Sequence, residues 1–367
     1  MSAAVVVPLV PQSYAVPLLR PAPSVELLPR EQGAAWDAYV ARRADATLYH
    51  LHAWRDVAER VYGIPTTFLV ARDGSGGPLR GVLPLFRIPR PTMPYLTTGI
   101  FGAYGKLLAD DDVYARALLN AAMQRIDLGD ASYLHLKLLG GVPAELPLQR
   151  QDVWVTVRRR LESSDAAIFA GLSSGMRNKI RHAQRAGLTF HRGKADLDAF
   201  YEVLSTNMRR KGAPIYGKQF FESLLESFGD RADIVTLRHQ GRVVSGALVA
   251  WTHGTLYVPF SSSLPSVFPL RASNLLWWEI MRTARGVGAH TLDFGSSMRE
   301  TTGLDFKTGW RGSVVEPIGS YLYAAEGVEP VLVPKASATA RAAVRVLGWL
   351  PRPIYEAVGP GISRWIA

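Results

Sequence analysis

Along the chain, apolar positions change between helical and strand-like spacing in a fixed order. From residue 52 to 63 an apolar side chain recurs every three or four positions until a glycine interrupts the series, which predicts an amphipathic helix. Two apolar stretches follow, at 67–71 and 79–86, and a glycine-rich turn separates them. Their length and composition predict two paired strands after the helix.

The same order recurs in the second half of the chain. There, an apolar series at 221–229 ends at a glycine, and strand-like stretches follow at 233–237 and 243–251. Each copy then continues with another amphipathic helix and another apolar strand, at 133–138 in the first copy and 290–294 in the second. We interpret this order as an internal duplication of a mixed α/β unit.

The pattern also predicts the fold class and the domain organisation. Strands that alternate with helices and also form hairpins favour a mixed α/β (α+β) sheet flanked by helices over a purely parallel sheet. Pro143 and Pro147 punctuate the chain between the copies, so we place the first domain at 1–153 and the second at 154–317. The last segment, from about 318 to 367, is expected to return to the first domain and complete it.

Composition narrows the possible chemistry. The chain has 367 residues, 48% of them hydrophobic, which is enough apolar surface to form packed cores. It has no cysteine, which excludes disulfides, thiolate metal sites and cysteine nucleophiles, and its scattered histidines suggest no metal site. Residues 1–10 lack the basic start of a signal peptide, and no run of about 18 apolar residues is present, so we expect a cytoplasmic protein.

The net charge of +11 favours an anionic partner, such as a phosphate-bearing donor, a nucleic acid or an anionic membrane face. Charge alone does not distinguish these partners from a role in solubility. The helix predicted at 172–187 presents Arg177 and Arg181 on one face, beside an apolar stripe. This face is either an anion-binding ridge or a solvated basic surface.

Two further segments place polar groups where a helix starts or a strand ends. Arg271 precedes a predicted helix that Ser273 or Asn274 could cap, which would leave backbone amides for an anion. The stretch at 257–263 ends a strand with three serines, but we find no partnered histidine to activate one of them. We therefore exclude hydrolase chemistry.

The most distinctive segment is 292–310, where charged residues and glycines follow a strand. Its charged side chains are Asp293, Arg299, Glu300, Asp305 and Lys307. The Asp-Phe-Gly triplet in it is not a kinase signature, because the glycine-rich loop and the catalytic loop of kinases are missing.

This segment, with the helix at 176–187 and the loop at 211–216, resembles the Fem-type (FemAB-like) branch of the GNAT acetyltransferase superfamily. The resemblance is strongest to proteins associated with exopolysaccharide and PEP-CTERM export systems. It implies two tandem GNAT-like (acyl-CoA N-acyltransferase) domains, of which the second is the active one. It also implies transfer of an acyl or aminoacyl group to an amine of a cell-envelope or polysaccharide-related acceptor.

The resemblance further implies where the site lies. In the family, the Asp-Phe-Gly strand and a following Phe-Lys-x-Gly-Trp motif line the site, which corresponds here to Asp293, Gly295, Ser296, Lys307 and Gly309. The candidate residues are, as catalytic groups, Asp293, Glu300, Asp305 and Lys307; for the donor, Tyr257, Ser261, Arg271, Ser273 and Asn274; and for the acceptor, Arg177, Arg181, Tyr216, Gly295, Ser296 and Trp310.

Acyl transfer to an amine requires donors for the oxyanion and a group that assists deprotonation. We expect backbone amides between residues 257 and 261 to polarise the acyl carbonyl, and one of the three carboxylates to assist deprotonation directly or through water. Lys307, Arg177, Arg181 and Arg271 are expected to hold phosphates.

The sequence leaves two classes of donor possible, an acyl-CoA thioester and an aminoacyl-tRNA. No long heptad run forms the coiled-coil arm of Fem-type proteins, and neither copy has the Gln/Arg-x-x-Gly-x-Gly/Ala pyrophosphate loop of typical acetyltransferases.

A different interpretation is a non-catalytic module that binds an anionic polymer or a membrane surface. The amphipathic tail at 340–350 and the following Trp365 would suit a peripheral contact with the inner membrane face, although we expect this tail to pack on the first domain.

Overall fold

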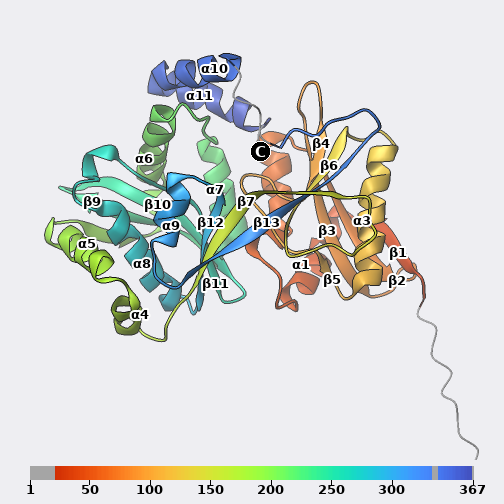
Figure 1. Ribbon diagram of the computed structural model, residues 1–367, viewed down its shortest axis with the longest axis horizontal. Helices are drawn as coiled ribbons and strands as arrows, with labels where there is room; N and C mark the ends of the chain where they lie inside the picture. Colours follow the sequence, from red (N-terminus) through yellow and green to blue (C-terminus); the bar gives the residue numbers. More distant parts are fainter. Residues whose placement is uncertain (1–20, 333–337, 366–367) are drawn as a thin grey trace, which may run out of the picture.

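The strands of the computed structural model, which describes residues 21–332 and 338–365, form one mixed sheet of 13 strands. Their order is β1-β2-β3-β4-β6-β13-β7-β12-β11-β10-β9-β8, and β5 pairs with β3. The mixed α/β fold class is therefore confirmed. Figure 1 shows that the sheet and its helices form two lobes, one for each copy of the repeat. Residues 1–10, on which the expectation about a signal peptide rests, lie outside the described residues.

The first lobe follows the order predicted for the first copy. Its strands are β1 (Pro23–Leu27), β2 (Thr66–Asp73), β3 (Leu79–Ile88), β4 (Tyr95–Thr97), β5 (Leu108–Ala109) and β6 (Tyr133–Leu139). Its helices are α1 (Gly33–Ala41), α2 (Ala53–Asp56) and α3 (Asp112–Asp127), with the short helical segments η1 (Arg30–Gln32), η2 (Leu48–His50) and η3 (Val57–Val61).

The second lobe repeats this arrangement and adds helices before its hairpin. Its strands are β8 (Thr189–Arg192), β9 (Ala232–His239), β10 (Arg242–Thr252), β11 (Thr255–Ser263) and β12 (Thr291–Met298). Its helices are α4 (Asp165–Gly171), α5 (Ser174–Arg185), α6 (Leu197–Arg210), α7 (Lys218–Phe228), α8 (Ala272–Gly286) and α9 (Thr302–Thr308), with short turns η4 (Lys194–Asp196), η5 (Gly229–Arg231) and η6 (Pro265–Val267).

Two long strands, β7 (Gln149–Arg160) and β13 (Ser313–Ala324), join the lobes. They pair antiparallel with each other, and β7 also pairs with β12 of the second lobe while β13 pairs with β6 of the first. Figure 1 shows both strands crossing between the lobes. The domain bounds 1–153 and 154–317 remain a proposal, since the sheet continues across them.

In each lobe one pair of neighbouring strands is parallel and soon separates. β11 and β12 pair at three positions, the last being Tyr257↔Asp293, and β4 and β6 also pair at three, the last being Thr97↔His135. Past Tyr257, β11 contains Pro259, which has no N–H for a further ladder bond. The two strands of the second lobe therefore diverge and leave an opening between them.

In the first lobe, the corresponding opening is filled by the chain itself. The Thr98 amide donates to the His135 carbonyl (3.3 Å), the Lys137 amide donates to Thr98 Oγ1 (2.9 Å), and the Gly105 amide donates to the Lys137 carbonyl (3.3 Å). Phe101, between these anchors, is buried. Residues 98–105 thus take the place next to β6 that stays open in the second lobe.

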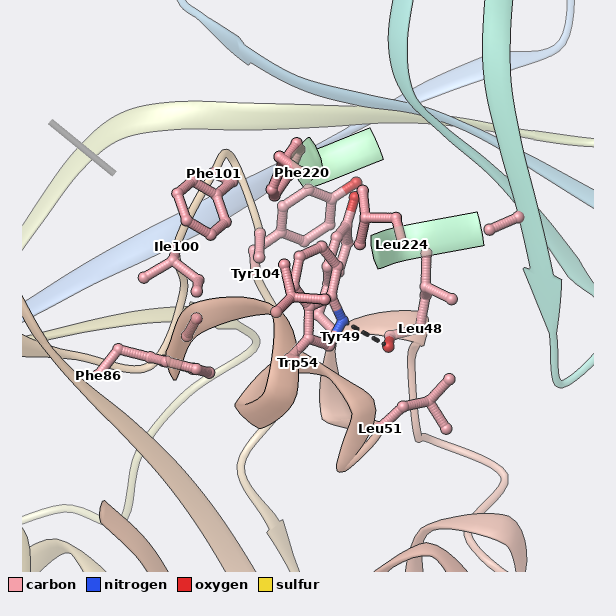
Figure 2. Packing of buried hydrophobic residues seen from close by; sticks show 14 of the residues in the cluster. Leu48, Tyr49, Leu51, Trp54, Phe86, Ile100, Phe101, Tyr104, Phe220 and Leu224 are labelled. Atoms are coloured by element: carbon pink, nitrogen blue, oxygen red, sulfur yellow. Dashed lines mark hydrogen bonds between the residues drawn. The ribbon is translucent and has the colours of Figure 1, made fainter. Parts of the chain in front are cut away.

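Aromatic side chains from both lobes pack where the lobes meet. Tyr49 and Tyr104 of the first lobe lie with ring centres 5.1 Å apart, and Phe101 packs on Phe220 of α7 at 4.7 Å. Figure 2 shows this cluster, together with Trp54, whose indole N–H donates to the Leu48 carbonyl at 3.0 Å. The contact fixes the lobes against each other and positions Tyr49 and Phe101 beside the second lobe's opening.

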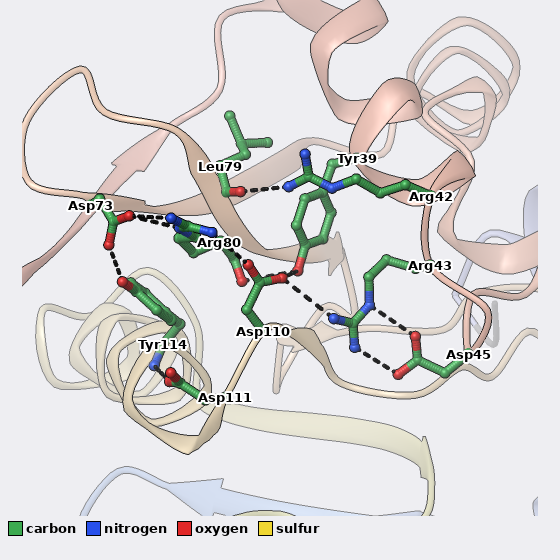
Figure 3. Close-up of polar contacts among 10 residues, drawn as sticks. All are labelled: Tyr39, Arg42, Arg43, Asp45, Asp73, Leu79, Arg80, Asp110, Asp111 and Tyr114. Atoms are coloured by element: carbon green, nitrogen blue, oxygen red, sulfur yellow. Dashed lines mark hydrogen bonds and ion pairs between the residues drawn. The ribbon is translucent and has the colours of Figure 1, made fainter.

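A polar network fixes the outer part of the first lobe (Figure 3). Asp110, which follows β5, accepts from the Tyr39 hydroxyl at 3.0 Å and from Arg43 and Arg80 at 3.3 Å each. Arg80 also donates to Asp73 at 2.7 Å. Since these residues lie on α1, β2, β3 and their turns, the network stabilises the packing of the lobe at a distance from the opening in the second lobe.

The two C-terminal helices, α10 (Ala338–Trp349) and α11 (Arg352–Ser363), pack mainly on α6 of the second lobe. The Tyr355 hydroxyl donates to the Ala213 carbonyl (2.6 Å), and Arg209 of α6 donates to the Leu350 carbonyl (2.9 Å). The expectation that this tail packs on the first domain is therefore wrong for its main contacts. Within the described residues, no helix is long and apolar enough to cross a membrane.

Candidate active site in the second lobe

A cavity lies in the opening between β11 and β12. The two strands, the segment from α6 to α7 and the first lobe all contribute residues to its lining. Its lining residues are Tyr49, Phe101, Gly102, Leu204, Met208, Pro214, Ile215, Tyr216, Val258, Pro259, Phe260, Ser261, Phe294, Gly295, Ser296 and Lys307. The cavity is thus formed by both lobes and has a mostly apolar lining with one cation.

Gly295 lies where β12 turns away from β11. Its φ of 75° lies in the left-handed region, and a Cβ at this position would lie 3.0 Å from the Val258 carbonyl oxygen. The next residue, Ser296, reaches the first lobe, since its hydroxyl donates to the Gly102 carbonyl at 3.2 Å. A side chain on residue 295 would therefore close the opening that the two strands leave.

Lys307 lies over this turn. It is on α9, which Thr301 caps by accepting from the Leu304 amide. Its ammonium group donates to the Gly295 carbonyl at 2.8 Å and to the Ser296 carbonyl at 3.0 Å. Burial lowers the pKa of Lys307 to about 8, and the nearby Asp293 opposes this shift. Lys307 thus brings a positive charge to the cavity wall and ties α9 to the end of β12.

Asp293 lies beneath the cavity rather than in its wall. It is 1% exposed, and its Oδ1 accepts from Tyr104, from Thr156 at 3.0 Å and from the Gly295 amide at 2.8 Å. Burial raises the pKa of this carboxyl, while these hydrogen bonds and the nearby Arg158 oppose the rise. Asp293 therefore orients Gly295 and joins the lobes, without direct access to a substrate.

A second cavity adjoins the first on the side of the first lobe. It shares Gly102, Tyr216 and Ser296 with the first, and its other lining residues are Ala103, Tyr104, Lys137, Trp154 and Ile318. Lys137 is half-buried here, and within the described residues its ammonium group has no hydrogen-bond or ion-pair partner. Burial and the nearby Arg90 lower the pKa of Lys137 to about 8. The arrangement leaves an unpaired cation next to the candidate site.

A third cavity extends from Lys307 to the start of α8. Ser261, Ser263, Ser273 and Lys307 are among its lining residues. The helix begins at Ala272, and its N-cap residue is Arg271, whose side chain makes no capping bond. The first amides of α8 therefore have no side-chain cap.

The prediction that Ser273 or Asn274 caps α8 is wrong, because both lie inside its first turn. The Ser273 hydroxyl instead donates to Ser263 Oγ at 2.9 Å, while Asn274 is buried and donates to the Met176 sulfur at 3.2 Å. Tyr257 is also buried, at 2% exposure, and lies behind the cavity lining. Of the five predicted donor residues, Ser261 and Ser273 line a cavity and Arg271 lies exposed beside one.

Several predicted residues lie away from these cavities. Glu300 and Asp305 are exposed, and neither is among the residues that line the described cavities. Trp310 is fully buried in the core of the second lobe, where its ring lies 6.2 Å from Phe306, so a substrate cannot reach it.

The two arginines of α5 contact residues of the preceding segment of the chain. The helix itself is as predicted, with Ser173 as its N-cap and an apolar stripe that is buried. Arg177 donates to the Ala170 carbonyl at 3.1 Å, and Arg181 lies over the Phe169 ring at 5.3 Å. Neither arginine lines one of the described cavities, so their role in binding a substrate remains a prediction.

Sequence reasoning missed the contribution of the first lobe. Tyr49, Gly102 and Lys137 come from the first copy, and only the packing of the lobes brings them to the opening of the second. One signal was present: His135 and Lys137, two positions apart, are polar residues on one face of an otherwise apolar strand. Within the described residues, no group of three or more potential metal ligands is found.

A comparison with known protein families points to the same part of the chain. Residues 172–307 match the model of the acetyltransferase (GNAT) domain, a span that includes α5, the opening and Lys307. No curated protein matches the chain.

Among solved structures, FemX is similar over 82% of this chain and 97% of its own, with a TM-score of 0.65 at 16% identity. A tandem GNAT protein from the clavulanic acid biosynthesis pathway is similar over 84% of this chain and 100% of its own (TM-score 0.52, 13% identity). The C-terminal domain of a putative lysylphosphatidylglycerol synthetase from Agrobacterium fabrum is similar over 87% and 95% (TM-score 0.54, 13% identity). These similarities establish a shared fold.

Proposed function

The chain contains an acetyltransferase (GNAT) domain within a tandem GNAT fold, and the fold it shares with FemX is consistent with the FemAB-like branch. On this premise we propose that it is an N-acyltransferase, which transfers an acyl or aminoacyl group from an activated donor to an amine. The observation that carries the proposal is the opening between β11 and β12, with Lys307 in its wall and unpaired strand backbone facing it.

The donor would enter from the side of α8. Its anionic part would lie by the uncapped start of α8 and Arg271, because helix N-termini and cations both favour negative charge. Ser261 and Lys307 belong to both the cavity at α8 and the main opening, so a donor that extends between them would bring its acyl end past Lys307.

The chemical step needs no covalent intermediate with the protein. The amine nitrogen attacks the acyl carbonyl carbon, the bond from that carbon to the sulfur of a thioester or the oxygen of an ester breaks, and the amine proton passes to the leaving sulfur or oxygen. The developing oxyanion requires hydrogen-bond donors. Since Pro259 has no N–H, we assign this role to those amides between Val258 and Ser261 that do not bond to β10, together with the Lys307 ammonium group.

The carboxylates contribute less to the proposed reaction than the sequence suggests. Among the described residues, no carboxylate lines the opening, so we assign Asp293 to positioning Gly295 rather than to direct proton transfer. Glu300 and Asp305 are exposed and would act only through water.

The acceptor would enter through the second cavity, from the side of the first lobe. Gly102 and Ser296 border both cavities, so an amine placed between them would reach the acyl carbon. The unpaired Lys137 would bind an anionic group, carboxylate or phosphate, on the same acceptor, and Trp154 would cover its apolar part. An amine on an anionic cell-envelope or polysaccharide precursor, free or lipid-linked, fits this arrangement.

Two donor classes remain candidates, an acyl-CoA and an aminoacyl-tRNA. The GNAT domain favours the first, and the similarity in fold to a protein named as a lysylphosphatidylglycerol synthetase keeps the second under consideration. The net charge of +11 suits either polyanion.

A binding experiment tests the proposal. At one low salt concentration, we expect the purified chain to bind either acetyl-CoA and longer acyl-CoA thioesters or a charged tRNA in a way that depends on its aminoacyl end. Lys307→Ala should weaken this binding or the subsequent turnover by at least about tenfold, because an interaction of a charged donor with the transferred group is lost.

The matched control is Lys179→Ala, which removes an exposed lysine on α5, and it should leave binding and turnover unchanged. Loss of activity in both variants would point to general charge rather than to the opening. Salt-sensitive binding to an anionic polymer, without turnover of any donor by the wild-type protein, would replace the proposal with the binding-module interpretation.

A further inference from the structure

The exposed face of α11 is apolar throughout. The residues of this helix, all described, that are exposed are Pro353, Ile354, Ala357, Val358 and Gly361, and Trp365 continues the row. Their spacing of three or four places them on one face. A helix on the surface of a globular protein usually presents polar residues to water, so this face is the reverse of the common pattern.

The charged residues of α11 and of its C-cap form contacts within the protein. Arg352 pairs with Glu202 of α6 and with Glu356, each at 2.7 Å, and Arg364 donates to the Gly63 carbonyl at 3.3 Å. They therefore hold the helix in place, and the apolar face points away from the contacts that fix it.

The neighbouring helix α10 also exposes apolar side chains near its C-terminal end. Trp349 is 90% exposed and Val346 59%, beside the half-exposed Val344. Of the thirteen large hydrophobic residues that are exposed in the described part of the chain, six lie between 344 and 365. Exposed apolar residues that gather in this way mark an interaction surface rather than ordinary scatter.

Cations lie near the two ends of this surface. Arg345 is exposed on α10 itself. Gly212, a Cβ on which would lie 2.2 Å from the Val344 carbonyl oxygen, directly follows the exposed Arg210 and Lys211 at the end of α6. At the other end, Arg90 donates to the Trp365 carbonyl at 3.2 Å. Positive charge thus lies beside both ends of the apolar face.

We infer that α10 and α11 dock on the surface of an anionic bilayer. Apolar side chains with tryptophans at helix ends, and cations alongside, are the combination by which helices bind in the plane of a membrane interface. In Figure 1 the two helices lie at one end of the second lobe, beyond α6, where a flat surface could contact both. The small apolar area makes this contact reversible and dependent on the anionic lipid.

The docking surface lies close to the candidate site. α11 packs on Ala213, Ile215 and Gly217, while Leu204, Met208 and Tyr216 of the same stretch of chain line the main cavity. Contact with a bilayer would therefore hold the cavity near the lipid headgroups. The inference does not depend on the proposed function, because binding to vesicles is measured without any donor.

Vesicle cosedimentation with the full chain tests the inference. We expect binding to vesicles of phosphatidylcholine with phosphatidylglycerol, weaker binding to phosphatidylcholine alone, and release between about 0.05 and about 0.5 M salt. The double substitution Trp349→Gln/Val358→Gln should weaken binding by at least about tenfold, because two apolar side chains no longer enter the interface. Arg345→Gln should weaken it several-fold on the anionic vesicles only.

The control is Val113→Gln/Leu128→Gln, which removes two exposed apolar side chains, 56% and 75% exposed, at the ends of α3 in the first lobe. It should bind like the wild type, and thermal unfolding should show all variants folded. Equal binding by the two double variants would overturn the inference. So would a wild-type chain that ignores anionic vesicles but forms a dimer that Trp349→Gln/Val358→Gln dissociates, which would identify the face as a contact between copies.

Discussion

Each lobe contains an equivalent pair of parallel strands, and the two strands separate at the equivalent position in both lobes. Only the opening in the second lobe is accessible. In the second lobe, β11 and β12 part after Tyr257↔Asp293 and leave a cavity. In the first lobe, β4 and β6 separate after Thr97↔His135. Residues 98–105 fill the gap and form hydrogen bonds with the backbone amide and the backbone carbonyl of Lys137. The segment that closes one opening also forms a wall of the other, through Phe101 and Gly102.

This difference indicates how the two copies of a duplicated fold can take different functional roles. One copy keeps an open strand pair for a donor, while the other fills its own opening and turns the filling segment toward the neighbouring lobe. Tyr104 is an example, since it lies in the filling segment of the first lobe and donates to Asp293 of the second. We therefore expect one active site per chain, formed by both lobes.

The largest expected effect comes from closing the second opening. Gly295→Val would place side-chain atoms against the Val258 carbonyl, which lies 3.0 Å from an ideal Cβ, at a backbone angle that valine disfavours. We expect turnover to fall by about 100-fold or more, because the carbonyl and amine can no longer approach. Steady-state rates with the donor identified by binding measure it.

The control for this substitution is Gly140→Val. Gly140 has a similar backbone angle, with φ of 89°, but a Cβ there meets nothing within 4 Å. It should lose some stability through the same backbone strain and keep its turnover number. If both glycine variants lost activity equally, backbone strain rather than the opening would explain the loss.

Two buried residues at equivalent positions allow a finer comparison. Asp293 and His135 are each the last paired residue before their strands part. Asp293 accepts from Tyr104, Thr156 and the Gly295 amide, whereas the His135 side chain forms one hydrogen bond within the described residues, with Ser320 at 3.1 Å. Asp293→Asn should lower turnover by about tenfold and destabilise by about 2 kcal/mol, because the three donors then meet a neutral acceptor and an NH2 group replaces the oxygen that faces Arg158.

His135→Gln should cost about 1 kcal/mol of stability and leave turnover within about twofold, since one neutral hydrogen bond is at stake. Urea unfolding and steady-state kinetics on both variants give the two quantities. A His135→Gln variant as inactive as Asp293→Asn would contradict the assignment of the active site to the second lobe.

The sequence alone was sufficient for the fold but not for the whole site. Periodicity and glycine positions predicted the duplicated α/β order, because each helix and strand is decided by short-range spacing. The family resemblance also indicated Gly295, Ser296 and Lys307, which lie on one local segment and line the cavity. It could not indicate that Trp310 is a core residue, since burial depends on packing across the lobe.

Residues from distant segments could not be predicted for the same reason. Lys137 and Gly102 reach the second lobe only through the pairing of β13 with β6 and the packing of aromatic side chains between lobes. The roles of Arg177 and Arg181 depend equally on neighbours, here Ala170 and Phe169, that a helical spacing does not reveal.

The expected effect of replacing Lys137 is also small, and its direction is informative. A half-buried cation without a described partner destabilises the fold, so Lys137→Met should raise the free energy of unfolding by about 1 kcal/mol at pH 7. Burial lowers the pKa of Lys137 to about 8, so above this pH the unfolded chain binds more protons than the folded one. Wild-type stability therefore rises relative to Lys137→Met between about pH 8 and about pH 10.

The same substitution should raise KM for an anionic amine acceptor several-fold, while KM for the donor stays constant, because Lys137 borders only the cavity assigned to the acceptor. A residue whose removal stabilises the protein and weakens one substrate is retained for binding rather than for folding. Lys307, whose ammonium group is held by two carbonyls, should behave differently and lower turnover when it is removed. If Lys137→Met instead destabilised the chain and left the acceptor KM unchanged, Lys137 would be a structural residue of the closed opening, and the acceptor would have to enter elsewhere.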